Sequence, residues 1–209
     1  MRLFAGTAQA PTPVPDELLT RLAGVPVANI ADGMGRLGMM DSRIRPVYAG
    51  ARLCGRAHTV WTRAGDNRAI HESIEGLRPG DVLVVNGEGD RTRALLGELI
   101  AARVKLRGAV GIVIDGAVRD VQGLADYDMP TFACAVTGAG PYKNGPGAVG
   151  VPIAVGGVAV SPGDIIVGDD DGVVVVPSEH ALAAAEAGEV KQAAEDATRA
   201  ELESAMRRL

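Results

Sequence analysis

Apolar residues in the middle of the chain form short, uninterrupted runs bounded by Gly, Pro and Asp. Such runs lie at 82–85 (VLVV), 109–114 (AVGIVI) and 173–176 (VVVV). Short runs rich in β-branched residues and flanked by turn residues are typical of strands buried on both faces. Between the first runs lie stretches with the three- and four-residue spacing of amphipathic helices, and strand pairs follow later. The pattern predicts the α/β class with a mixed sheet.

The same pattern sets the expected elements and turns. Asn86-Gly87-Glu88-Gly89 has the residue types of a hairpin turn, and Asp115-Gly116 predicts a turn after the run at 109–114. We expect helices at 16–22, 27–37, 67–77, 97–106 and 121–127, and strands at 51–61, 82–85, 91–96, 109–114, 129–136, 165–167 and 173–176. The segment 151–160 contains the Gly156-Gly157 break, which predicts a strand pair or a bulged strand.

The chain changes character at Ser178, where Ala, Glu, Lys and Arg begin to dominate and helical spacing continues to Leu209. Gly188 interrupts this pattern, and no strand pattern follows. We therefore expect an α/β domain over 1–177, with a helical lead-in, and a helical extension over 178–209. A helix of this kind must pack on something, either its own domain or a neighbouring subunit.

Composition and charge narrow the class of protein. Hydrophobic residues make up 47% of the 209 residues and aromatic residues only 3%, so the core must consist of Val, Ile, Leu and Ala. The net charge of −5 argues against a general nucleic-acid-binding protein. No apolar run approaches the roughly 18–20 residues of a membrane span. Cys54 and Cys134 are isolated thiols without zinc-type spacing, which suits a reducing cytoplasm.

The candidate chemistry lies just after the run at 109–114. Arg119 and Asp120 follow each other there, and Glu98 lies at the start of the helix that leads into this run. A guanidinium suits a carboxylate or enolate oxygen, and Asp is a hard oxygen ligand suited to Mg²⁺ or Mn²⁺. A plain surface ion pair explains Arg119 and Asp120 equally simply, and from residue types alone it is the more frequent situation.

The start of the helix at 97–106 offers a second way to bind an anion. Free backbone N–H groups around Glu98, Leu99 and Ile100 can hold a substrate carboxylate, and Gly97 allows a ligand to approach closely. The structural alternative is that Glu98 simply stabilises the helix, because a carboxylate at a helix N-terminus interacts favourably with the helix dipole.

A family resemblance changes this balance. Twenty residues separate Glu98 from the Arg119-Asp120 pair. This spacing resembles the D/E-x20-R-D signature of the RraA-like family, which includes metal-dependent 4-hydroxy-4-methyl-2-oxoglutarate / 4-carboxy-4-hydroxy-2-oxoadipate aldolases. The resemblance covers roughly residues 25–205, and the segments that carry it are RIRPV at 43–47, RPGDVLVV at 78–85, GAVGIVIDGAVRD at 108–120 and SPGDIIVGDDDGVVVVP at 161–177.

The resemblance implies a fold, an assembly and a set of roles. The fold is a swivelling β/β/α domain, and the assembly is a homotrimer or hexamer with active sites between subunits. One divalent metal, Mg²⁺ or Mn²⁺, is held largely through water, with Asp120 as the direct protein ligand and Glu98 holding metal-bound water. Arg119 binds the keto-acid oxygen that becomes the enolate. A glutamate of an adjacent subunit completes the site; by position this is Glu195, with Glu189 and Glu201 as competitors.

The implied activity is cleavage of 4-hydroxy-2-oxo acids to release pyruvate, with oxaloacetate decarboxylation through the same enolate. The main alternative is a non-catalytic regulator that binds ribonuclease E, as some family members do. Such a regulator can lose the Asp of the Arg-Asp pair, whereas Asp120 is present here. A methyltransferase is a third reading, but NGEGD at 86–90 lacks the following helix and the acidic partner of a nucleotide-binding loop.

Three further features receive structural interpretations. Asp169-Asp170-Asp171 resembles a metal site, but its position between two strands favours a solvated hairpin turn. The segment 138–147 (GAGPYKNGPG) contains Lys143 and could cradle an anion, although a flexible rim loop is the simpler interpretation. The histidines are scattered through the chain, and we expect none to be catalytic: His58, His71 and His180.

Overall fold

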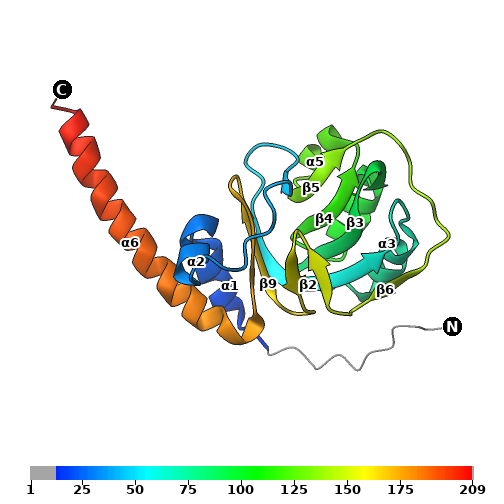
Figure 1. Ribbon diagram of the computed structural model, residues 1–209, viewed down its shortest axis with the longest axis horizontal. Coiled ribbons are helices and arrows are strands. Elements are labelled where there is room, and N and C mark those ends of the chain that lie inside the picture. Colours follow the sequence, from blue (N-terminus) through cyan, green and yellow to red (C-terminus); the bar gives the residue numbers. More distant parts are fainter. Residues whose placement is uncertain (1–12, 209) are drawn as a thin grey trace.

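The computed structural model describes residues 13–208, and one eight-stranded sheet organises them. The strand order is β1-β5-β4-β3-β2-β9-β10, with β6 pairing to β2 (Figure 1). Its four central strands are parallel, as expected where helices connect successive strands. These strands are β2 (Leu53–Thr62), β3 (Asp81–Leu96), β4 (Gly111–Val118) and β5 (Thr131–Val136).

The sheet is mixed because its outer strands are antiparallel, which confirms the predicted class. β9 pairs with the first part of β2, and β6 pairs with its end. A separate hairpin turns at Gly156-Gly157, so of the two alternatives predicted for 151–160 the strand pair is confirmed. The bounds are β1 (Arg45–Pro46), β6 (Gly147–Val149), β7 (Ile153–Val155), β8 (Val158–Val160), β9 (Ile165–Asp169) and β10 (Gly172–Val176).

Three hydrophobic clusters give the layers. On one face of the parallel strands, Leu83, Ile112 and Ile114 pack against the helices. On the other face, Val84, Val113 and Phe132 pack against β7, β8 and β10. The helices of the first face are α3 (Arg68–Ser73), continued by the 3₁₀ turn η1 (Ile74–Gly76), α4 (Glu98–Leu106) and α5 (Val121–Asp126).

A third layer covers the outer side of β9 and β10. Val167 and Val174 belong to a cluster with apolar side chains of α1 (Asp16–Ala23), α2 (Val27–Gly33) and α6 (Ala181–Met206), which follows η2 (Ser178–His180). Asp169 fastens this layer, because its carboxylate accepts a hydrogen bond of 3.0 Å from the backbone N–H of Val27. The segment 169–171 is therefore a hairpin turn, as predicted, but Asp169 is buried and not solvated.

Helix α6 extends far beyond the layer that it joins. Its buried residues all lie in its first eight positions, and Figure 1 shows the remaining turns running away from the sheet. Its 26 residues correspond to roughly 39 Å. Gly188 does not interrupt the helix; a Cβ there would lie 3.0 Å from Val25, so the glycine permits close contact with the preceding layer. Within residues 13–208, no helix combines the length and apolar character needed to cross a bilayer.

Two predicted turns are absent because β3 and β4 run past them. The segment 86–89 is an irregularity inside β3 and not a hairpin turn, so the predicted strand at 91–96 is the end of β3. Glu88 and Gly89 adopt positive φ values of 59° and 68°, and the strand then resumes beside β4. The parallel partner therefore overrides the local turn propensity of Asn86-Gly87. The expected helix at 27–37 is also shorter, since it ends at Gly33.

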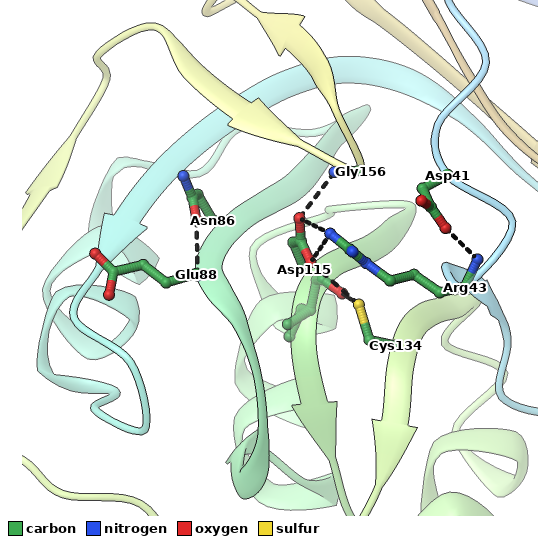
Figure 2. Close-up of polar contacts among 8 residues, drawn as sticks. Asp41, Arg43, Asn86, Glu88, Asp115, Cys134 and Gly156 are labelled. Atoms are coloured by element: carbon green, nitrogen blue, oxygen red, sulfur yellow. Dashed lines mark hydrogen bonds and ion pairs between the residues drawn. The ribbon is translucent and has the colours of Figure 1, made fainter.

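Asp115 lies inside β4 and not in a turn, and its carboxylate is saturated with donors (Figure 2). The backbone N–H of Gly156 donates to Oδ2 at 2.9 Å, and the thiol of Cys134 donates to Oδ1 at 3.1 Å. Nη2 of Arg43 lies 3.3 Å from both oxygens. This carboxylate therefore joins β4, β5, the β7–β8 turn and the segment that precedes β1.

Candidate functional site

The end of β4 delivers Arg119 and Asp120 to the edge where the parallel strands terminate. The backbone N–H of Arg119 donates to the carbonyl of Leu96 at 3.0 Å, which aligns the ends of β3 and β4. Asp120 has a left-handed backbone, with φ 58° and ψ 44°, and its carbonyl accepts the N–H of Leu124 as α5 begins. Left-handed backbone at a non-glycine residue is uncommon and concentrates at functional sites.

Helix α4 begins directly against the Asp120 carboxylate. A Cβ on Gly97 would lie 2.1 Å from Oδ2 of Asp120, so only glycine fits between β3 and α4 in this arrangement. The backbone N–H of Glu98 donates to the same oxygen at 3.4 Å. The first turn of α4 thus faces the carboxylate, as the favourable interaction of a helix N-terminus with an anion requires.

The Glu98 side chain lies against α5. A Cβ on Gly123 would meet Oε2 of Glu98 at 2.0 Å, so a second glycine makes room for the second carboxylate. Nε of Arg119 lies 3.4 Å from Oδ2 of Asp120, and these two side chains are 44% and 41% exposed. The structure therefore brings the three candidate residues together. The Asp120 carboxylate lies against Gly97, and the Glu98 carboxylate lies against Gly123.

These residues border a small pocket. Its lining includes four of the five residues expected to bind substrate, Gly97, Leu99, Ile100 and Arg119, but not Glu98. Of the backbone donors that the sequence indicated, only one is free. Glu98 donates to Asp120, and Ile100 donates to the carbonyl of Gly97 at 3.2 Å. The Leu99 N–H has no protein acceptor within the described chain. The lining comprises Asn67, Ala94, Leu95, Leu96, Gly97, Leu99, Ile100, Arg119, Asp120 and Pro141.

Asn67 is a pocket residue that the sequence pattern did not reveal. Its position before α3 is that of a helix cap, yet its side chain caps nothing and donates instead to the carbonyl of Leu95 at 3.0 Å. Asn67 is 2% exposed, and its Oδ1 has no partner among the described residues. A cap-type residue was the available signal, but the contact with Leu95 depends on the tertiary fold.

The glutamates of α6 lie away from this pocket within one chain. Glu189 is engaged elsewhere, because Nε and Nη2 of Arg21 donate to its two oxygens, each at 2.8 Å. That contact holds the pKa of Glu189 below its ordinary value. Glu195 and Glu201 are exposed and belong to the later turns of α6, a helix that projects away from the sheet (Figure 1).

The donor set is compatible with a divalent cation held largely by water. Among residues 13–208, no three His, Cys, Asp or Glu side chains converge on one point. Asp120 and Glu98 contribute two hard oxygen donors, and Gly97 lets the Asp120 carboxylate lie directly against the start of α4. Mg²⁺ and Mn²⁺ prefer such ligands, and Mg²⁺ usually keeps several waters. The residues present therefore fit such a cation.

Comparison with known proteins identifies the family of the chain. The family model described as RraA-like, Aldolase/RraA, matches residues 27–175. The chain belongs to this family. A protein of *Halalkalibacterium halodurans*, provisionally named 4-hydroxy-4-methyl-2-oxoglutarate aldolase, is 36% identical over 181 residues, covering 87% of this chain and 86% of its own. A *Thermus thermophilus* protein named 4-hydroxy-4-methyl-2-oxoglutarate aldolase is 37% identical, covering 61% and 77%.

Solved structures of RraA proteins share the fold. The structure of *Streptomyces coelicolor* RraAS2, described as an unusual member of the RNase ES inhibitor RraA family, aligns with a TM-score of 0.80 at 31% identity. The alignment covers 90% of this chain and 99% of RraAS2. The RNA-processing inhibitor RraA of *T. thermophilus* aligns with a TM-score of 0.67 at 32% identity, covering 73% and 92%. Relatives of this chain are thus named either as aldolases or as RNA-processing inhibitors.

Proposed function

We propose that this RraA-like chain is a divalent-metal-dependent lyase that cleaves 4-hydroxy-2-oxo acids such as 4-hydroxy-4-methyl-2-oxoglutarate and releases pyruvate. Decarboxylation of oxaloacetate follows as a second activity, because both reactions pass through the enolate of pyruvate. The observation that carries the proposal is the half-exposed Asp120 carboxylate beside Arg119, held in left-handed backbone against the first turn of α4.

The residues of the pocket divide the work of binding. The free N–H of Leu99, at the positive end of α4, suits the carboxylate of the substrate's 2-oxo acid end. The guanidinium of Arg119 suits the neighbouring keto oxygen, on which negative charge develops as the C3–C4 bond breaks. Mg²⁺ or Mn²⁺, when bound, supplies Lewis acidity at that oxygen. Asp120 is the residue that would hold the cation directly.

The proton balance is the same for each cleaved aldol. The 4-hydroxyl loses its proton and becomes a ketone, while C3 takes up a proton to become the methyl group of pyruvate. Glu98, whose side chain lies against Gly123, would orient the water that removes the hydroxyl proton. In oxaloacetate the same bond breaks with loss of carbon dioxide, so no hydroxyl proton is involved.

We extend the proposal to the assembly. A homotrimer or hexamer would bring Glu195 of the partner subunit to the pocket, since α6 projects from its own domain with its later turns exposed. Most helical stability in proteins comes from tertiary packing, so a protein contact along the projecting turns is expected. Sedimentation of the purified chain tests the assembly, and Glu195→Gln should lower turnover without dissociating it.

The deciding experiment measures pyruvate release from both substrates, with Mg²⁺ or Mn²⁺ and with chelator. We expect metal-dependent turnover that Asp120→Asn lowers on the order of 10²-fold or more. Asn is chosen because it tolerates left-handed backbone, so the fold is retained.

Asp128 provides a matched control, because it is also an aspartate with positive φ, 46°, at the other end of α5. Asp128→Asn should leave turnover within about twofold, as expected of surface positions. Wild-type protein that is folded, supplied with metal and still inactive on both substrates would overturn the lyase proposal. The ribonuclease E-binding reading would then come first.

A further inference from the structure

The segment 138–147 is hydrogen-bonded to the domain near both ends, contrary to the expectation of a flexible rim loop. Near its start, the carbonyl of Ala139 accepts the backbone N–H of Ala94 at 2.8 Å. Near its end, the buried carboxylate of Asp66 accepts the backbone N–H of Asn144 at 2.8 Å. The part of the segment between these contacts is therefore held in place.

Arg93 holds the middle of this segment. Its Nη1 donates to the carbonyl of Gly140 at 2.8 Å, and its Nη2 donates to the phenolic oxygen of Tyr142 at 2.9 Å. The guanidinium also lies over the Tyr142 ring, with 4.2 Å between Cζ and the ring centroid, so a cation–π contact adds to the hydrogen bonds. Within the described chain no carboxylate forms an ion pair with Arg93. Between the two residues that Arg93 binds lies Pro141, which lines the pocket.

The same segment contacts the guanidinium of Arg119. A Cβ on Gly140 would lie 3.6 Å from Nη1 of Arg119, which is ordinary van der Waals distance. At the other end of this side chain, a Cβ on Gly97 would lie 2.9 Å from Cγ. The Arg119 side chain therefore packs against the start of α4 near its base and against Gly140 near its tip.

Packing, and not hydrogen bonding, holds the tip of Arg119. The polar contact of its side chain is the one between Nε and Oδ2 of Asp120, at 3.4 Å. Neither Nη atom donates to another residue of the described chain. These N–H groups are therefore free to meet a substrate oxygen, but their direction depends on the backbone of Gly140 beside them.

We propose that Arg93 is a positioning residue for the reaction: it holds Gly140 against Arg119 and so fixes the direction of that guanidinium. The inference rests on the proposed function, in which Arg119 acts on the keto oxygen. An interaction that strengthens as negative charge develops contributes to kcat more than to substrate binding. Loss of the contact should therefore lower kcat and leave KM almost unchanged.

Arg93→Met tests this role, because methionine removes both hydrogen bonds and keeps an unbranched side chain. We expect kcat for pyruvate release to fall roughly tenfold, with KM within about twofold of the wild-type value. Tyr142→Phe removes the phenolic acceptor and keeps the ring, so it should lower kcat only about two- to threefold. Circular dichroism verifies that each variant is folded.

Arg56→Met is the matched control. Arg56 also donates to a backbone carbonyl, that of Val14 at 2.6 Å, and to the carboxylate of Asp16 at 2.5 Å. It lies opposite Asp81 where β3 begins, at the other end of the parallel strands from Arg119. Arg56→Met should lower stability without changing kcat, so a loss of stability alone cannot imitate the expected result.

A second measurement asks whether Arg93 acts through Arg119. Arg119→Lys keeps the charge but replaces the planar guanidinium by a flexible ammonium, whose direction does not depend on Gly140. Added to Arg119→Lys, Arg93→Met should lower kcat by less than about twofold, because the effects of two residues that act as a unit are not additive. The same tenfold loss in both backgrounds would show that Arg93 does not act through Arg119.

The outcomes separate the inference from the function on which it rests. If wild-type protein releases pyruvate and Arg93→Met leaves kcat unchanged, or raises KM instead, the positioning role is wrong while the lyase proposal stands. If wild-type protein is inactive on both substrates, both proposals fail. Should Arg93→Met not fold, Tyr142→Phe decides, and an unchanged kcat in that variant overturns the positioning role. Should Arg119→Lys be inactive, the kcat and KM of Arg93→Met decide alone.

Discussion

Two aspartates on one strand and its extension, Asp115 and Asp120, show how differently the same side chain can be used. The side chain of Asp115 is 9% exposed, and its carboxylate accepts hydrogen bonds from three partners. The side chain of Asp120 is 41% exposed, and the polar contacts of its carboxylate are no shorter than 3.4 Å. Asp115 also has ordinary strand backbone, while Asp120 is left-handed. The hydrogen-bonding capacity of the Asp115 carboxylate is used within the fold, whereas the Asp120 carboxylate remains available to a ligand.

The difference teaches where to look for chemistry in this chain. A buried carboxylate is tolerated only when donors compensate for its lost hydration, and such a group has no capacity left for a ligand. A carboxylate held in position by backbone geometry, with few donors, keeps that capacity. Hydrogen-bond saturation separates the two roles here better than proximity in sequence does.

The largest expected effect comes from Asp115. Asp115→Asn removes the charge opposite Arg43 and turns one acceptor into a donor, so at least one of the donors around it loses its partner. We expect a loss of about 3 kcal/mol in the free energy of unfolding, measured by urea denaturation. Asp120→Asn should cost less than about 1 kcal/mol in the same assay.

Asp41 supplies the control for this experiment. Its Oδ1 accepts the backbone N–H of Arg43 at 2.8 Å, but the residue is exposed (Figure 2). Asp41→Asn should therefore change the unfolding free energy by about 0.5 kcal/mol or less. Equal losses for Asp41→Asn and Asp115→Asn would mean that saturation does not mark the structural carboxylate.

A smaller effect is expected from the glycines that seat the acidic side chains. Gly97→Ala places a Cβ where Oδ2 of Asp120 lies, and Gly123→Ala does the same to Oε2 of Glu98. Displacement of either carboxylate should lower kcat/KM for pyruvate release by roughly tenfold or more. Gly138→Ala, in open space, is the control and should have no such effect. Full activity of Gly97→Ala would show that the position of Asp120 is not critical.

The smallest effect concerns the thiol beside Asp115. Burial, followed by the hydrogen bond and negative charge of Asp115, raises the pKa of Cys134 to about 11. Because the folded pKa is raised, this thiol contributes stability below its ordinary pKa of 9.0, and that contribution is lost as pH rises toward 11. Alkylation by iodoacetamide at pH 8 should be roughly 100-fold slower than in unfolded chain.

Asp115→Asn sharpens this last measurement, because it removes the charge that disfavours the thiolate. Alkylation of Cys134 should accelerate in that variant even under conditions where the protein stays folded, as judged by circular dichroism. Cys54 is the internal reference: burial raises its pKa to about 12, and Asp115 has no part in that shift. Acceleration at both cysteines would indicate general unfolding and not a local change.

The sequence pattern predicted the layers well because the strands and helices of each layer have a local hydrophobic periodicity. The buried runs at 82–85 and 109–114 became the central strands, and Gly97 and Glu98 lie where a helix start was expected. The predicted turns at 86–89 and 115–116 failed for one reason. The residue types at both places favour a turn locally, whereas pairing between β3 and β4 continues past both places.

The candidate site was predictable only in part. The sequence indicated Glu98 at a helix start and Arg119-Asp120 after a strand, and the structure brings these residues together. Three further contacts join residues far apart in sequence. Asn67 enters the pocket through Leu95, and Asp66 acts through the backbone of Asn144. Gly123 matters only because the Glu98 side chain crosses to α5. No periodicity in a single segment reports such contacts.

The left-handed backbone at Asp120 also has a consequence for which substitutions the gene can accumulate at this codon. The residue types that accept this conformation most readily are Gly, Asn and Asp. Asn and Gly are each reached from an aspartate codon by a single base change. One nucleotide substitution can therefore remove the carboxylate while the domain continues to fold. Such a change would abolish the proposed lyase activity and leave a protein of the same shape. That protein remains available for other uses, such as binding a partner.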